Sequence, residues 1–221
     1  MLLTQVADSE LGGPAFPEDG TVFGASVLVV NQRTKMIEAV TEYEVFDHTG
    51  QRLAVVRQIG QSRTKRLVRL LWWFDQFFTH HFDVIAADGA VVMRLTRPRK
   101  LYMSRVNVFD SADRYLGCIR QYNMIGRIRF GVEDASGQTW AFMTADNLRA
   151  WDFSLVGSSG LVFAEVVKSW EGWMRTFLSP SDRYVSKVHV PLPEPLRSLT
   201  LAWVLTIDLA LKQDARGLGR F

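Results

Sequence analysis

The sequence predicts a mostly β protein, folded as a closed antiparallel β-barrel of about twelve strands around a buried hydrophobic C-terminal helix. Two observations carry this prediction. A hairpin pattern occurs five times along the chain, and one short apolar helical segment lies near the C-terminus. Apolar residues make up 48% and charged residues 22% of the chain, which argues against a disordered chain or a coiled coil.

The 221 residues are enough for one domain with a large core. Residues 1–20 lack the basic start and long apolar region of a signal peptide, and we expect a loose lead-in there. Residues 21–213 form the single predicted domain, with its central helix at 197–212, and residues 214–221 form a tail. Cys118 is the only cysteine, which rules out an intrachain disulfide and suits a reducing cytoplasm.

The five hairpins share alternating apolar and polar residues on both sides of a short polar turn. This period of two is typical of a strand with one buried face. The turns read "DHTG", "AADG", "DSAD", "DASG" and "GSSG", and their first positions are Asp47, Ala86, Asp110, Asp134 and Gly157. Aspartate at the first position accepts bonds from backbone N–H groups two residues on, and glycine at the fourth adopts a positive φ.

Five hairpins give ten strands, and the segments "GASVLVVNQ" and "YVSKVHVPL" add two more. So many antiparallel strands must curl or close to protect their edges. We expect a closed barrel, with a sandwich as the alternative.

The segment "SLTLAWVLTIDLALK" follows the proline-rich "PLPEPLR", as is common at the start of a helix. Its apolar run, Leu199–Leu211, is about 20 Å long as a helix, whereas a bilayer core is about 30 Å thick. Asp208 within the run would be costly at membrane depth. A helix enclosed by the barrel is therefore favoured over a membrane span or anchor.

Five segments, in order, resemble the phospholipid scramblase family and the wider Tubby C-terminal-like superfamily. They are "VLVVNQRTKMIEAVTEYEVFDHTGQRL", "VVMRLTRPRK", "YLGCIRQ", "KSWEGWMRTF" and "VLTIDLAL". The resemblance runs from about residue 27 to residue 212. It implies a twelve-stranded barrel around a C-terminal helix.

Two features of animal scramblases are missing from this chain. Their acidic calcium-binding segment corresponds here to "LSPSDRYVSKVHVPLPEP", in which only Asp182 and Glu194 are acidic. Because a Ca²⁺ site uses six to eight oxygens and usually several carboxylates, we expect no calcium binding. The palmitoylated cysteine cluster of the family is absent too.

No phosphate-loop, dinucleotide or paired-cysteine zinc signature occurs in the sequence, so we expect no enzymatic activity, no cofactor and no metal. His80 and His81 are adjacent on a predicted strand, point to opposite faces and cannot easily share one ion. "GSSG" lies between two strands, which is not the context of a nucleophilic serine.

Two basic segments are the candidate sites for lipid or anion binding. Basic residues attract anionic headgroups, and tryptophan prefers the membrane interface. The first segment, "RTKRLVRLLWWFDQFF", and the second, "RLTRPRKL", supply the candidates Lys65, Arg66, Arg69, Trp72, Trp73, Arg97, Arg99 and Lys100. For Trp72 and Trp73 the favoured alternative is a place in the core.

The net charge of +3 is compatible with anionic partners but identifies none of them. We expect a non-enzymatic, scramblase-related protein that binds anionic phospholipid headgroups or an acyl chain, in the cytoplasm or peripherally at the inner face of the membrane. The alternative is a soluble interaction or regulatory protein whose basic face binds a protein partner, with nucleic acid less favoured.

Overall fold

The computed structural model describes residues 14–35, 40–59, 79–99, 103–122, 129–147, 152–167 and 183–217. They form twelve strands and a helix, α3 (Leu196–Gly217). The strands are β1 (Val27–Lys35), β2 (Val40–Phe46), β3 (Arg52–Ile59), β4 (His80–Ala86), β5 (Val91–Arg97), β6 (Arg105–Asp110), β7 (Tyr115–Gln121), β8 (Phe130–Asp134), β9 (Thr139–Asn147), β10 (Asp152–Gly157), β11 (Val162–Val167) and β12 (Arg183–Val188).

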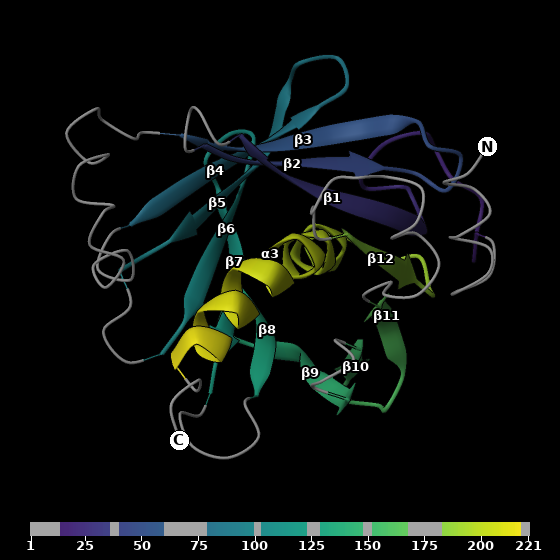
Figure 1. Ribbon diagram of the computed structural model, residues 1–221. Helices are drawn as coiled ribbons and strands as arrows, with labels where there is room; N and C mark the ends of the chain where they lie inside the picture. The colour runs from purple at the N-terminus through teal and green to yellow at the C-terminus, as the bar shows by residue number, and fades with distance from the viewer. Residues whose placement is uncertain are drawn as a thin grey trace.

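Each strand pairs antiparallel with its neighbours in the chain, and β12 pairs with β1 to close the barrel (Figure 1). The predicted closed barrel of about twelve strands is thus confirmed, and the alternative of a sandwich is wrong. Among the twelve strands of the described residues, closure leaves no edge unpaired, which removes the usual route to edge-to-edge aggregation.

The five predicted turns all form, and each is closed by a bond from the fourth N–H to the first carbonyl. In three of them the aspartate side chain at the first position also accepts the N–H two residues on, as predicted. The fourth residue always has a positive φ, for example 86° at Gly50. In "DSAD" this position is Asp113, with φ 62°, so an aspartate adopts the conformation that glycine adopts elsewhere.

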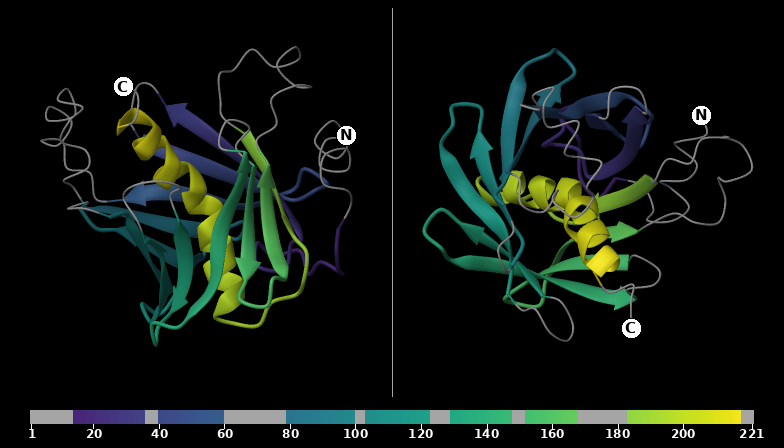
Figure 2. Two further views of the ribbon diagram at one scale, coloured as in Figure 1. Left: turned by 90° about the horizontal axis from the view of Figure 1, so that it is seen from below. Right: turned by 60° about the vertical axis from the view of Figure 1, so that its left-hand side comes forward.

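The barrel has two distinct ends. The turn end carries the five tight turns that follow β2, β4, β6, β8 and β10. The loop end is the opposite one, where β3, β5 and β7 finish and β4, β6 and β8 begin. Helix α3 starts at the turn end and runs inside the barrel toward the loop end (Figures 1 and 2).

The barrel encloses α3, as the sequence predicts. Every side chain from Ser198 to Ile207 is buried, and the helix contributes Leu199 and Trp203 to one core cluster shared with strand residues such as Met93 and Leu155. The helix ends at Gly217, five residues beyond the predicted end at 212. In the part of the chain that is described, no helix combines the length and the apolar character that crossing a bilayer requires.

Candidate functional site

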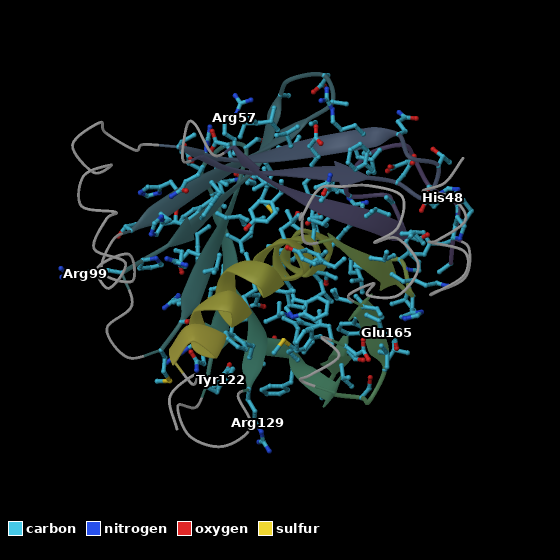
Figure 3. All side chains as sticks on the ribbon, viewed as in Figure 1. His48, Arg57, Arg99, Tyr122, Arg129 and Glu165 are labelled. Atoms are coloured by element: carbon cyan, nitrogen blue, oxygen red, sulfur yellow. The ribbon has the colours of Figure 1, made fainter. Side chains whose placement is uncertain are left out.

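Charged side chains are divided between the two ends of the barrel. Among the described residues, the exposed carboxylates all lie at the turn end: Asp19, Asp88, Asp113 and Glu194. Five exposed arginines lie toward the loop end: Arg57, Arg99, Arg105, Arg120 and Arg129. Figure 3 labels three of them, Arg57, Arg99 and Arg129, on separate parts of the molecule. Among the described residues, the loop end is therefore the more basic one, and we call it the basic end.

Two further exposed arginines of the described residues lie at the turn end, and each has a carboxylate partner. Arg114 lies 2.6 Å from Asp110, and Arg52 lies 3.8 Å from Glu44. Their charges are thus compensated within the protein. The turn end offers little net positive charge to a partner.

At the loop end, Arg105 and Arg120 lie directly opposite each other on β6 and β7. Like charges in this position destabilise a strand pair. Arg120 lies 3.7 Å from the carboxylate of Glu133, whereas Arg105 donates hydrogen bonds to Asn107 and Tyr115, both of them neutral. The single negative charge of Glu133 thus lies near the two positive charges of Arg105 and Arg120. The positive charge that it does not neutralise is available to an anion.

The second predicted basic segment is divided between the inner face of β5 and the chain that follows this strand. Arg97 lies on the same side of the strand as the core residues Met93 and Leu95, and it is only 8% exposed. Arg99, just beyond the strand, is exposed (Figure 3). Of these two arginines, Arg99 is therefore the one that an anion in solution can reach. Lys100 lies outside the described residues.

Arg97 belongs to a layer of polar side chains on the inner wall near the loop end. His80 pairs with Arg97 across β4 and β5, its ring nitrogen contacts the amide of Gln58, and its ring stacks on Phe82. His81 points outward and bonds to Thr96 at 3.1 Å. The prediction that the two histidines occupy opposite faces is confirmed.

The first predicted segment, with Lys65, Arg66, Arg69, Trp72 and Trp73, also lies outside the described residues. Its flanks are described, because Ile59 ends β3 and His80 begins β4. Ile59 pairs with His81, which pairs with Thr96 near the end of β5. The strands that bound both predicted segments are thus neighbours at the loop end.

Sequence reasoning missed four of the five loop-end arginines: Arg57, Arg105, Arg120 and Arg129. Arg57, Arg105 and Arg120 each stand singly in the sequence, and Arg129 has only Arg127 near it, so none of the four lies in a long basic run. The sequence feature that could have identified them is their position in the predicted hairpins. Each lies at or near the strand terminus farther from the tight turn.

In the described ranges no group of three or more His, Cys, Asp or Glu side chains is placed to hold a metal ion. Cys118 is buried, and burial raises the pKa of its thiol. The thiol donates to the Glu133 carboxylate at 3.5 Å. Since the thiolate is the nucleophilic form, these surroundings do not favour reactivity.

Three comparisons place this chain among known proteins. The model of the protein family described as Scramblase matches residues 18–211. The X-ray structure of a protein from Arabidopsis thaliana is similar at 13% identity, over 80% of this chain and 90% of that chain, with a TM-score of 0.46. No curated protein is similar enough to count as a match.

Proposed function

The chain belongs to the scramblase family, and we propose that it binds anionic phospholipid headgroups at a membrane surface through the loop end of its barrel. The observation that carries the proposal is the segregation of charge described above. Five of the seven exposed arginines of the described residues lie toward the loop end, and the exposed carboxylates of these residues lie at the turn end. A barrel polarised in this way orients itself on an anionic surface with the loop end toward it.

The energetics favour reversible association. Each basic residue close to an anionic leaflet contributes about 1 kcal/mol, and salt screens this attraction over about 10 Å at 0.1 M. Several arginines acting together give measurable binding that weakens as the ionic strength rises. The proposal includes Lys65, Arg66, Arg69 and Lys100 as further cations, with Trp72 and Trp73 at the interface.

In this proposal the protein is non-enzymatic and cytoplasmic, and it associates peripherally with the inner face of the membrane. The bound group is a headgroup phosphate, with an acyl chain as a second contact. No calcium ion takes part.

Vesicle flotation tests the proposal. The wild-type chain is mixed with phosphatidylcholine vesicles, with vesicles that also contain phosphatidylserine, or with no lipid. The test variant replaces Arg99, Arg105 and Arg129 by Gln. The matched control replaces the turn-end residues Arg52, Arg114 and Arg197 by Gln, which changes the net charge equally but alters residues that pair with Glu44, Asp110 and Glu194.

We expect flotation only with phosphatidylserine, a loss of flotation at high salt, and a much larger loss in the test variant than in the control. Equal losses in both variants would contradict a site at the loop end. A wild-type chain that does not float, but binds an oligonucleotide or a protein through the same arginines, would favour the alternative function.

A further inference from the structure

Three aromatic side chains are exposed on the outer wall of the barrel. Tyr122 is 37%, Trp140 38% and Phe142 43% exposed, although side chains of this size are usually mostly buried. Tyr122 directly follows β7, and Trp140 and Phe142 lie on the outward face of β9. Between them, Gly131 of β8 pairs with Phe142 on one side and Arg120 on the other. We call these three side chains the aromatic wall.

The polar atoms of the aromatic wall are hydrogen-bonded to other side chains of the protein. The Tyr122 hydroxyl donates to the Glu133 carboxylate and lies 2.9 Å from the Thr139 hydroxyl. The Trp140 indole N–H donates to Asp134 at 2.9 Å. These bonds fix the rings before any partner arrives, so binding would cost little side-chain entropy.

The rings also support each other. The Tyr122 and Phe142 rings are 5.8 Å apart, and the Tyr122 ring lies over Gly131, where a Cβ atom would come within 2.5 Å of it. Glycine at 131 is therefore what allows the Tyr122 ring to lie against the sheet. What remains exposed of the wall is mainly apolar ring surface.

Positive charge borders this apolar surface. The Arg120 guanidinium lies 5.8 Å from the centre of the Tyr122 ring, and Arg105 is opposite Arg120 on β6. The backbone N–H of Tyr122 donates to the carbonyl of Arg129 at 2.8 Å, which places a third arginine beside the wall. Figure 3 shows Tyr122 and Arg129 at the same part of the molecule. An apolar ring surface bordered by arginines is complementary to the bilayer interface, because the arginines can contact headgroup phosphates while the rings contact the start of the acyl chains.

We propose that the aromatic wall inserts into the interface of a bilayer containing anionic phospholipid, so that the barrel is tilted and its β7–β9 side lies against the bilayer together with the adjoining part of the loop end. This inference rests on the proposed membrane binding and adds the orientation and the apolar contact. Trp and Tyr prefer the boundary between headgroups and acyl chains. A base-reading surface would need free polar donors, whereas the Tyr122 and Trp140 donors are already bonded to carboxylates.

Two measurements test the inference. The first is flotation of Trp140→Ala/Phe142→Ala with phosphatidylcholine/phosphatidylserine vesicles, beside Ile59→Ala as the control. Ile59 is 41% exposed and ends β3, which lies across the barrel from the aromatic wall, with β4 to β7 between β3 and β8. We expect the double variant to lose about tenfold or more in vesicle partitioning, from the apolar area that it removes, and the control to change less than twofold.

The second measurement does not remove the wall. A fluorophore is attached at Phe142→Cys or at Ile59→Cys, while the native Cys118 is buried. With vesicles whose acyl chains carry nitroxide quenchers, we expect quenching at position 142 and none at position 59.

If the wild-type chain floats but the double variant floats equally well and the label at 142 is not quenched, the inference is overturned and the proposed function stands. If the wild-type chain does not float, both fail. If the double variant loses oligonucleotide binding but keeps flotation, the wall binds nucleic acid instead, and the inference is wrong.

Discussion

The indole Nε1 of Trp140 donates a hydrogen bond to Oδ2 of Asp134 over 2.9 Å, across the turn between β8 and β9. The other oxygen of Asp134 accepts from the hydroxyl and backbone N–H of Ser136 and from the N–H of Gln138. One carboxylate thus holds the tight turn and an exposed aromatic side chain together. These hydrogen bonds, first that of the Ser136 hydroxyl and then that of Trp140, lower the pKa of Asp134 from 3.8 to about 2.

We predict that this carboxylate makes stability depend on pH in acid. Because the pKa of Asp134 is lower in the folded chain than in the unfolded chain, its contribution is present above about pH 4 and is lost as the pH falls toward 2. In a carboxyl-detected NMR titration, Trp140→Phe should raise the pKa of Asp134 toward 3.8. A wild-type Asp134 that already titrates near 3.8 would contradict the bonded geometry.

Gly117 should tolerate no side chain. Its φ is +148°, and a Cβ atom would lie 2.1 Å from the backbone oxygen of Glu133 on β8. We expect Gly117→Ala to lower the free energy of unfolding by about 3 kcal/mol or more, through backbone strain and overpacking. The control is Gly89→Ala, where φ is +89° but nothing lies within 4 Å, and which should cost about 1–2 kcal/mol. Urea unfolding measures both; equal costs would exclude the clash at Gly117.

The enclosed helix should be essential for folding. Trp203 is 1% exposed inside the barrel, and Trp203→Ala should cost about 3–5 kcal/mol out of a total of about 5–15 kcal/mol. Truncation before Ser198 should abolish the fold, because it removes the helix from the shared core. Circular dichroism during thermal unfolding checks both variants. A truncated chain that still unfolds cooperatively would be incompatible with this role of the helix.

Calcium should have no effect at physiological concentrations. The prediction comes from the sparse carboxylates around Asp182, a residue outside the described part of the chain. Calorimetry should detect no micromolar Ca²⁺ binding, and flotation should be unchanged by added Ca²⁺ or by chelator. Micromolar binding that disappears in Asp182→Ala would refute it.

The sequence by itself determined the strands, the turns and the burial of the helix. These features are local, because a turn such as "DASG" contains both the aspartate that accepts the backbone N–H and the glycine with positive φ. The burial of the helix could also be predicted from a single segment. A helix that is apolar on all sides and too short to cross a bilayer has to be enclosed by protein.

Only the tertiary structure decided which side chains form the basic end and the aromatic wall. Arg57 and Arg129 are far apart in the sequence, and they share the basic end because twelve strands close into a barrel. Arg97 and Arg99 look equivalent in a basic run, yet Arg97 is the last residue of β5 and points into the barrel, whereas Arg99 lies beyond the end of the strand and is exposed. The exposure of a side chain also depends on the neighbouring strands. Cys118 in β7 and Tyr122 just after β7 both project outward, but neighbouring residues cover Cys118 and leave Tyr122 exposed.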